Sequence, residues 1–466
     1  MMGPIFYLCL FCQAWLQIPS QQDQKPNIIF IMADDLGYGD LGCYGQKKIK
    51  TPRLDKLATQ GIRFTDYYAG STVCAPSRCV LMTGKHVGHC RVRGNGGGLT
   101  QSLRPEDLTV AKVLKQAGYA TGLCGKWGLG DEGVAMVGAP TRQGFDFFYG
   151  YLNQHHAHNY WPTFLIRNEQ RETLPNEVTP IGKDGGGVAT KKVTYAPDLI
   201  LKEAVQFIEA NRSKPFFLYF SPILPHANNE ANRTKGNGCE VPDLGRYKDE
   251  PWTEQNKAQA AMITYLDMQV GQLLDSLEKL GLEKNTVVFF TSDNGPHREG
   301  GNQPEFFEAS GPFQGIKRSL HDGGIRVPMI VRWPGKIAAG KTTNQMGYHA
   351  DFLSTACEIA GVKIPHGQDG VSLVPTMKGD ESQNKRDFLY WEFYEGKGAR
   401  AIRLGSWKGV RNSWHGEFQL FDLGKDPAEK NNLASQYPDV VKTLVEGMEK
   451  AHKDSPDWPA PKLPAK

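Results

Sequence analysis

The sequence has no marked excess of charge of either sign. It contains 54 Lys and Arg residues and 50 Asp and Glu residues, which gives a formal net charge of +4. It also lacks a basic run and a stripe of alternating basic and aromatic residues, features that are typical of proteins that bind nucleic acids. We therefore expect no nucleic-acid partner, while a local positive pocket for an anionic substrate is compatible with this balance.

Long hydrophobic runs are absent beyond residue 20. A transmembrane helix needs about 20 consecutive apolar residues, and no later segment supplies them. The N-terminus, MMGPIFYLCLFCQAWLQIPS, is mostly apolar from Pro4 to Leu16, which indicates an export signal over residues 1–20. Its first residues include no Lys or Arg, so the alternative is an anchor that stays in the membrane. We expect a secreted or periplasmic protein whose mature chain has no stable membrane insertion.

The cysteines that follow the predicted signal are odd in number. Outside the cell, an odd count leaves at least one free or reactive thiol. The others could form up to three disulfides, whose pairing the sequence does not reveal. The seven residues are Cys43, Cys74, Cys79, Cys90, Cys124, Cys239 and Cys357.

Internal repeats and long low-complexity tracts are also absent. With 466 residues, 39% of them hydrophobic, the chain can bury a large core. From about Arg386 the sequence changes to short aromatic segments, so we predict a large domain over residues 21–385 and a smaller one over 386–466. The smaller domain is predicted as α+β, with strands over 388–393, 401–404 and 407–411, a turn over 422–427 and a helix over 440–451.

Short apolar runs alternate with helical patterns in the larger domain. We predict strands over residues 26–33, 119–125, 215–220, 286–291 and 327–331, because such runs are typical of strands buried on both faces of a sheet. We predict helices over 51–60, 109–117, 198–210 and 258–280. Residues 165–193 and 229–250 are polar and are predicted as surface loops. The alternation indicates an α/β fold with a large, mostly parallel central sheet sandwiched by helices.

Acidic pairs follow two of the predicted strands. Asp34-Asp35 come after the first, and Asp293-Asn294 come after the strand over 286–291. If both strands lie in one parallel sheet, these four side chains meet at its carboxyl edge. Three carboxylates that close repel one another unless a cation neutralises them, and oxygen ligands suit Ca²⁺ or Mg²⁺ rather than zinc. Either pair alone could cap a turn, but together they predict a metal site.

Cys74 opens the stretch CAPSRCVLMTG, for which three chemistries compete. One is a zinc site with neighbouring cysteines and histidines, but the spacing matches no common zinc pattern. Another is a disulfide between Cys74 and Cys79 across a helix start. The third is a reactive group: Pro76-Ser77-Arg78 indicates a helix N-terminus, where free N–H groups and the helix dipole favour an anion. The ligands of the zinc alternative would be Cys74, Cys79, His86, His89 and Cys90.

The run Cys74-Ala-Pro-Ser-Arg78 resembles the Cys-x-Pro-Ser-Arg signature of the formylglycine-dependent sulfatases, within the alkaline phosphatase superfamily. The resemblance extends from about residue 27 to 361, with a family-like tail, LFDLGKDPAEKNNLA. The chain looks most like secreted bacterial enzymes labelled arylsulfatase or N-acetylgalactosamine sulfatase. The other matching motifs occur in the family's order: Asp34-Asp35, Gly125-Lys126-Trp127, Pro225-His226, Asp293-Asn294-Gly295, Gly315-Ile316-Lys317 and GGIRVP over 323–328.

The resemblance implies an alkaline-phosphatase-like fold and the hydrolysis of sulfate esters. It implies that a formylglycine-generating enzyme oxidises Cys74 to an aldehyde, formylglycine (3-oxoalanine). As a hydrate, this group supplies one hydroxyl that attacks sulfur and a second that lets the bound sulfate leave. The implied metal is Ca²⁺ in preference to Mg²⁺, held by Asp34, Asp35, Asp293, Asn294 and residue 74.

The resemblance also implies roles for four charged or titrating side chains. Arg78, Lys126 and Lys317 would offset negative charge on the transferring group. His226 would give a proton to the leaving oxygen.

One motif departs from the family pattern. The family usually has Gly-Lys-Trp-His-Leu-Gly, whereas this chain has Gly128 in place of the histidine that helps to hold the nucleophile. We hypothesise that His156 or His158, in the segment NQHHAH, fills this gap. The alternative is that activity is lost and the chain is a sulfated-glycan-binding protein.

The expected substrate is a sulfated sugar or glycan. Aromatic clusters at 160–161 and 390–394 could stack on sugar rings, although such clusters are more often part of a core. Arg91 and Arg93 could reach an anionic neighbouring sugar. The alternative enzyme is a phosphodiesterase or phosphonate monoester hydrolase of the same superfamily.

Overall fold

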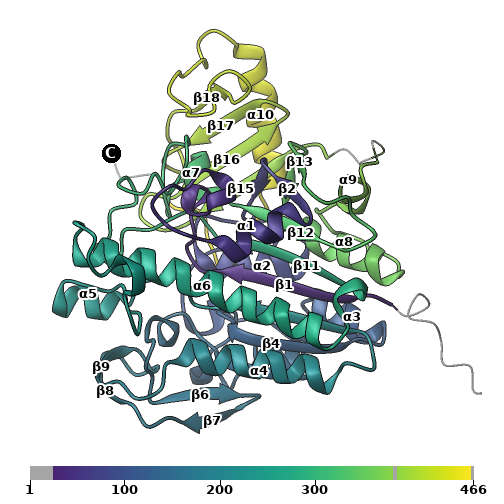
Figure 1. Cartoon of the computed structure of the whole chain (residues 1–466). Helices are drawn as coiled ribbons and strands as arrows, with labels where there is room; N and C mark the ends of the chain where they lie inside the picture. The colour runs from purple at the N-terminus through teal and green to yellow at the C-terminus, as the bar shows by residue number, and fades with distance from the viewer. Residues whose placement is uncertain (1–24, 381, 383–385, 463–466) are drawn as a thin grey trace, which may run out of the picture.

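The computed structural model describes residues 25–380, 382 and 386–462 (Figure 1). The predicted export signal lies outside these residues. Within them, no helix has both the length and the apolar character needed to cross a membrane.

Strands and helices alternate through the larger part of the chain. The strands are β1 Asn27–Ala33, β2 Ile62–Phe64, β3 Tyr67–Tyr68, β4 Ala120–Lys126, β5 Phe147–Tyr151, β6 Phe164–Arg167, β7 Gln170–Thr173, β8 Glu177–Pro180, β9 Gly187–Lys191, β10 Phe216–Ser221, β11 Thr286–Ser292, β12 Met329–Arg332, β13 Lys341–Thr343, β14 Gly347–Tyr348, β15 Leu389–Phe393, β16 Ala399–Leu404, β17 Trp407–Arg411 and β18 Gln419–Asp422.

The helices differ widely in length. They are α1 Pro52–Thr59, α2 Cys74–Thr83, α3 Val110–Gln116, α4 Ala196–Ala210, α5 Asn229–Lys235, α6 Glu254–Lys279, α7 Asp322–Ile325, α8 Asp351–Ala360, α9 Val374–Lys378 and α10 Pro438–Ala451.

A ten-stranded sheet forms the centre, with the order β13-β2-β12-β11-β1-β10-β4-β5-β6-β7. Its five middle strands, from β11 to β5, run parallel, while β12, β6 and β7 pair antiparallel with their neighbours. The predicted mostly parallel α/β sheet is therefore confirmed. Because the middle strands point the same way, their carboxyl ends lie along one edge.

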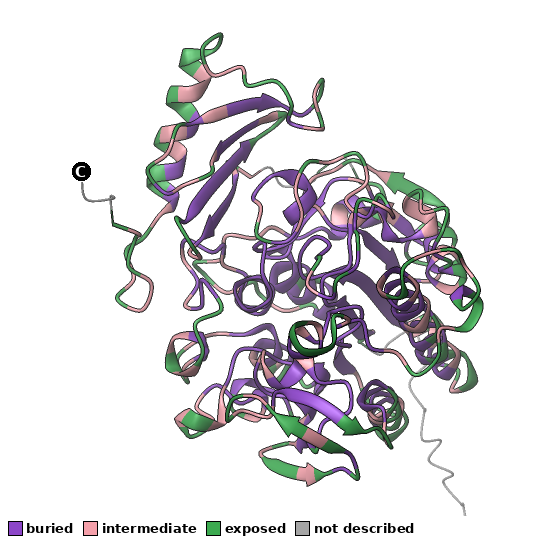
Figure 2. Cartoon of the chain, turned by 90° about the vertical axis from the view of Figure 1, so that its left-hand side faces the viewer, coloured by how far each residue is buried: buried purple, intermediate pink, exposed green. Residues whose placement is uncertain are grey.

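Both faces of the middle of this sheet are covered, as Figure 2 shows by the buried colour of its central strands. In β1, Ile28, Phe30 and Met32 belong to one hydrophobic core and Ile29 and Ile31 to another. The first core includes side chains of α2, α3 and α8; the second includes those of α1, α4 and α6. A strand with apolar side chains on both faces explains why these runs show no polar alternation.

Two predicted loops contain regular structure. Residues 165–193 include β7, the hairpin β8–β9 and most of β6, and residues 229–250 include α5. The loop prediction was wrong there because polar composition also suits short, exposed edge strands: Gln170, Arg171 and Thr173 of β7 are all exposed.

The C-terminal segment forms a separate antiparallel sheet with the order β15-β16-β17-β18. Helix α10 packs on one face, where Ile402 and Leu420 contact a small core that includes Leu444 and Met448. The other face contributes Trp391 to the main core. The predicted α+β subdomain is confirmed, with β18 as a strand that the sequence analysis missed.

Buried charges join the C-terminal sheet to the larger domain. The Lys408 ammonium lies 2.7 Å from Asp322 Oδ1 and 2.9 Å from Glu429 Oε1, and none of these three side chains is exposed. Arg403 forms a two-pronged ion pair with Asp66. Buried ion pairs fix the orientation of the segments that they join. Removing one partner is strongly destabilising, because the other charge is left buried without compensation.

We predict that Lys408→Met lowers the free energy of unfolding by about 3–5 kcal/mol, because it removes a cation shared by two buried carboxylates, of which Asp322 keeps only Arg326 as an ion-pair partner among the described residues. Chemical denaturation measures the change. The matched control is Lys425→Met, since Lys425 is 86% exposed and lies 3.9 Å from Asp422; such a surface pair contributes less than about 1 kcal/mol. Equal losses in both variants would contradict the role assigned to Lys408.

Candidate active site

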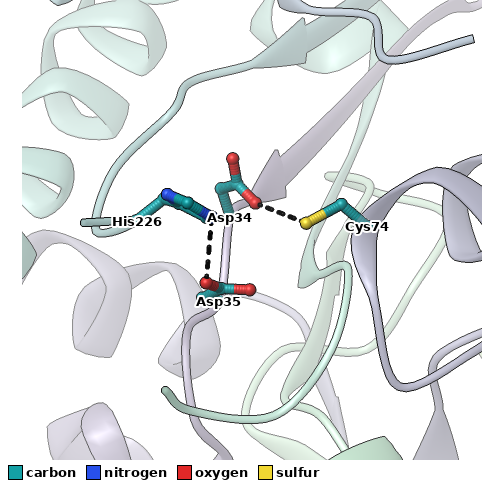
Figure 3. A group of neighbouring side chains, drawn as sticks. All are labelled: Asp34, Asp35, Cys74 and His226. Carbon is teal, nitrogen blue, oxygen red and sulfur yellow. Dashed lines mark hydrogen bonds and ion pairs between the residues drawn. The ribbon is translucent and has the colours of Figure 1, made fainter. Parts of the chain in front are cut away.

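The sequence-predicted residues converge at the carboxyl edge of the parallel strands. Asp34 and Asp35 follow β1, Asp293 and Asn294 follow β11, and Lys126 is the last residue of β4. His226 lies in the loop after β10, and Cys74 begins α2 (Figure 3). Ligands bind at this edge in open α/β sheets, so one sheet collects side chains that are far apart in sequence.

The four predicted oxygen ligands are fully buried and in contact with one another. Asp293 Oδ1 accepts a hydrogen bond from the Asp35 backbone N–H at 3.0 Å. Asn294 Nδ2 donates to Asp35 Oδ1 at 2.7 Å, which leaves Asn294 Oδ1 buried without a hydrogen-bond partner. An orphaned buried oxygen beside carboxylates fits a hard cation.

Three cations already balance these carboxylates. Lys126 Nζ lies 2.6 Å from Asp34 Oδ2, and Lys317 Nζ lies 2.8 Å from Asp35 Oδ2. Arg78 donates to Asp293 Oδ2 through Nε at 3.1 Å and Nη2 at 2.8 Å. The neutralising cations that the sequence analysis expected are thus present as side chains, and charge balance alone does not require a metal. The orphaned oxygen is the more specific indication.

The pKa values of Asp35 and Asp293 shift in opposite directions, because the charged neighbours of the two carboxyl groups differ. Burial would raise the pKa of Asp35, but the Lys317 ammonium holds it below its usual range. Burial and then the nearby Asp34 raise the pKa of Asp293 to about 6, against the opposing effect of Arg78. A carboxyl with this pKa is mostly ionised at neutral pH, and a bound cation would lower its pKa further.

Cys74 lies at the lip of this cluster, on a helix that is buried along its whole length. Its Sγ is 3.5 Å from Asp34 Oδ1. Burial raises the pKa of the thiol well above its usual value, against the opposing effect of Lys126. The side chain is thus a poor nucleophile as a cysteine.

His226 and Lys317 form a hydrogen-bonded pair beside Asp35. His226 Nδ1 lies 2.7 Å from the Ala227 carbonyl, and Nε2 lies 3.2 Å from Lys317 Nζ. A carbonyl only accepts, so Nδ1 carries the imidazole proton and Nε2 accepts from the ammonium. Burial and then Lys317 lower the pKa of His226 well below its usual value, so this ring is neutral.

The space beside Gly128 is filled by a residue that the sequence analysis did not consider. Gly128 has φ of +76°, and a Cβ built there would lie 2.2 Å from Gln154 Nε2. Position 128 is therefore closed to a side chain by backbone conformation and by Gln154 together.

The two proposed substitute histidines lie in different surroundings. His158 lines the active-site cavity, stacks on His226 with ring centroids 4.9 Å apart, and places Nδ1 3.0 Å from Glu230 Oε2. His156 is buried against Phe164, with ring centroids 4.3 Å apart, and does not line the cavity. The geometry favours His158 and removes His156 from the candidate site.

The competing chemistries for Cys74 are not assembled. All seven cysteines in the described residues are free, including Cys74 and Cys79. His86 and His89 stack on each other and contact Asp369 instead of Cys74. The metal-ligating groups beside Cys74 are Asp34, Asp35 and His226.

Several expected substrate contacts are wrong. Tyr160, Trp161, Tyr390 and Trp391 are buried in cores, where no sugar reaches them. Arg91 pairs with Glu106 and Asp107, as the short spacing between them allows. Arg93 is buried, with Nη1 donating to the Lys453 carbonyl at 2.7 Å.

Sequence analysis also missed three residues of the site. Glu299 lies 2.9 Å from Lys317 Nζ, Ser221 Oγ accepts from Arg78, and Glu230 bridges His155 and His158. Ser221 ends β10, so its position after a buried strand was a usable signal. Glu299 follows the Asp293-Asn294 pair closely, whereas Glu230 sits in a segment that was predicted as a loop.

Comparison with known proteins agrees with this geometry. The family model described as Sulfatase matches residues 26–362, and that described as N-sulphoglucosamine sulphohydrolase, C-terminal, matches residues 313–454. The chain is 32% identical to an N-acetylgalactosamine-6-O-sulfatase of Bacteroides thetaiotaomicron, over 92% of this chain and 93% of that protein. It is also 32% identical to human arylsulfatase A, over 90% of this chain and 86% of that protein.

A solved structure shares the architecture. It is that of Ps i-CgsB in complex with k-i-k-neocarrahexaose, with a TM-score of 0.77, 28% identity, and coverage of 94% of this chain and 95% of that one. The family match over most of the chain, with the acids, lysines and Cys74 gathered at one sheet edge, shows that this protein belongs to the sulfatase family and is a sulfuric ester hydrolase.

Proposed function

We propose that the protein hydrolyses a sulfate ester of a sulfated sugar, with a formylglycine made from Cys74 as its nucleophile. The observation that carries the proposal is the place of Cys74: it begins a buried helix, 3.5 Å from Asp34 and on the wall of a cavity that Lys317 and His226 also line. The sugar is inferred from relatives such as the N-acetylgalactosamine-6-O-sulfatase of Bacteroides thetaiotaomicron. A formylglycine-generating enzyme is the partner that maturation requires.

The proposed metal is Ca²⁺, with Mg²⁺ less suited to a crowded set of side-chain ligands. Asp34, Asp35, Asp293 and the orphaned Asn294 Oδ1 would hold it beside residue 74. When bound, a divalent cation lowers the pKa of an oxygen nucleophile and polarises an ester oxygen.

The chain's own residues supply orientation, charge and a proton. Arg78 fixes Asp293 with two donors and thereby fixes the end of β11. Lys126 and Lys317 place positive charge on two sides of Asp34 and Asp35, where they stabilise the charge that develops on the transferring group.

The leaving oxygen would receive its proton from the Lys317–His226 pair. His226 Nε2 accepts from Lys317, so the mobile proton lies on the ammonium and not on the ring. His226 remains the proposed contact to the leaving oxygen, and Lys317 its source of protons. His158 stacks on His226 and is held by Glu230, so it acts as a positioning residue for that ring.

We predict that Cys74→Ala reduces sulfate release from 4-nitrophenyl sulfate by about 10⁴-fold or more, because it removes the nucleophile. The control is Cys357→Ala, a buried thiol in α8, which keeps the rate. Bis(4-nitrophenyl) phosphate is tested beside the sulfate ester, since preference for it would favour the phosphodiesterase alternative. Binding of sulfated sugars without release by the mature protein would favour the binding-protein alternative.

We predict that Ca²⁺ raises the unfolding temperature of the wild type, since a ligand at 100 times its Kd adds about 2.7 kcal/mol to stability. Asn294→Ala should lose most of this shift because it removes an oxygen ligand. Asn412→Ala is the matched control, an exposed amide far along the chain that pairs with Gln419. An unchanged Ca²⁺ shift in the Asn294 variant would refute the assigned ligand.

We predict that His158→Ala lowers kcat/KM for 4-nitrophenyl sulfate by about tenfold or more, through loss of the stacked support for His226. His156→Ala lowers the unfolding temperature, because it empties a buried site, but changes kcat/KM of the folded protein less than twofold. The reverse pattern would restore His156 as the substitute for the missing histidine.

A further inference from the structure

The cavity that contains Cys74 extends well beyond the residues that would hold a sulfate. Its volume is about 480 Å³, within the range of small-molecule sites. Loops after β4, β5, β10 and β11 form much of its wall. The carboxylates on this wall are Asp131, Asp184, Glu299 and Glu395.

Every cation among the described lining residues is already paired with a carboxylate. Lys317 contacts Asp35 and Glu299, and Arg318 contacts Glu299 and Glu395. The third cation is a histidine whose ring lies between two carboxylates. None of these three positive side chains is therefore free to bind a second anion.

His155 is held on both of its nitrogens. Nδ1 lies 2.5 Å from Asp184 Oδ1, and Nε2 lies 3.1 Å from Glu230 Oε1. The hydrogen bond to Glu230 raises the pKa of His155 to about 9, against the opposing effect of burial. The ring is therefore cationic at neutral pH, and two carboxylates already neutralise it.

One carboxylate on the wall has no cation partner in the described part of the chain. Asp131 accepts only backbone N–H groups, from Gly133 at 2.8 Å and from Gly98 at 3.4 Å. Two amide oxygens on the same wall, Gln154 Oε1 and Asn229 Oδ1, are buried without any hydrogen-bond partner. The wall thus offers acceptors that lack donors.

We propose that this wall selects sugars that carry hydroxyl and N–H donors and no anion besides the sulfate that is hydrolysed. Asp131 and Glu395 accept hydrogen bonds from the sugar ring, the amides of Gln154 and Asn229 do so once they turn toward it, and the unpaired carboxylate repels a uronate or a second sulfate. The substrate class is a monosulfated neutral hexose or N-acetylhexosamine. This inference rests on the proposed function and adds the chemistry of the sugar to it.

The charge pattern explains why the two ends of the cavity differ. Below the cavity, Lys126, Lys317 and Arg78 balance the three acids, so a divalent cation bound there would leave this end positive and would favour one tetrahedral anion. On the wall, each cation is shared between acids, so a second anion gains no partner and loses its hydration. Specificity would come as much from repulsion of the wrong sugar as from contacts to the right one.

The test compares two substrates that differ by one charge. A panel of monosulfated galactose, N-acetylgalactosamine and N-acetylglucosamine isomers first identifies the best substrate. The second substrate is the same sugar with one more sulfate on a neighbouring hydroxyl. We expect the wild type to show a kcat/KM ratio of at least about tenfold in favour of the monosulfated sugar.

Two variants show whether the wall carries this ratio. Asp131→Asn and Glu395→Gln each remove one negative charge, and the second leaves Arg318 paired with Glu299 alone. Each variant should reduce the kcat/KM ratio of the monosulfated to the disulfated sugar at least about threefold, because it turns over the disulfated sugar faster than the wild type does. The matched control is Glu169→Gln, which removes a carboxylate paired with Arg142 outside the cavity and should keep the wild-type ratio.

Three outcomes overturn the inference: a wild type that prefers the disulfated sugar, a ratio near one, or an unchanged ratio in both folded wall variants. A narrower ratio in the wall variants but not in Glu169→Gln supports it. Failure of the proposed function is a separate result, namely no sulfate release from any sugar or from 4-nitrophenyl sulfate by the mature wild type.

Discussion

The contact between Arg78 and Asp293 is the interaction on which the rest of the site depends. Arg78 is fully buried, and its planar group donates to Asp293 twice, to the Lys126 carbonyl and to Ser221. It therefore joins helix α2 to the ends of β11, β4 and β10 at once. A lysine could not reproduce this fork, because it has no planar set of five donors.

This arrangement explains why Cys74 has so little freedom. One turn of helix separates it from Arg78, so fixing the guanidinium against three strands also fixes the start of α2. Lys126 and Lys317 then set the charge around Asp34 and Asp35 from either side. The result is a buried, preorganised site in which few groups need to move during a reaction. The cost is a set of buried charges that tolerate no loss of a partner.

Much of the fold could be predicted from the sequence, for physical reasons that particular elements make clear. The apolar runs of β1, β10 and β11 and the long amphipathic α6 are continuous local patterns, so their ends were placed within a few residues. The antiparallel direction of β12 and the short edge strand β7 were not predicted. Strand direction depends on partners distant in sequence, and an exposed edge strand has the composition of a loop.

The candidate site likewise has a part that the sequence predicts and a part that only the fold shows. Asp34 lies at the sheet edge that the buried strand before it predicts, and Lys317, which the family motif indicates, lies beside Asp35. Contacts between segments that are distant in sequence were not predicted. Gln154 fills the space beside Gly128, and Arg93 is buried and donates to the Lys453 carbonyl. Tyr160, Trp161, Tyr390 and Trp391, which were thought to face a sugar, are core residues, and none of them lines the cavity. A sequence shows which groups are present, whereas only the fold shows which of them lack a partner.

In the proposed mechanism, residue 74 of the mature enzyme is an aldehyde. The most direct measurement is the mass of the peptide that contains it, from protein produced in a host with the formylglycine-generating machinery. The account predicts a mass below that of the cysteine peptide and an aldehyde that reacts with a hydrazide. An intact thiol, in a host that converts a control sulfatase, would contradict it.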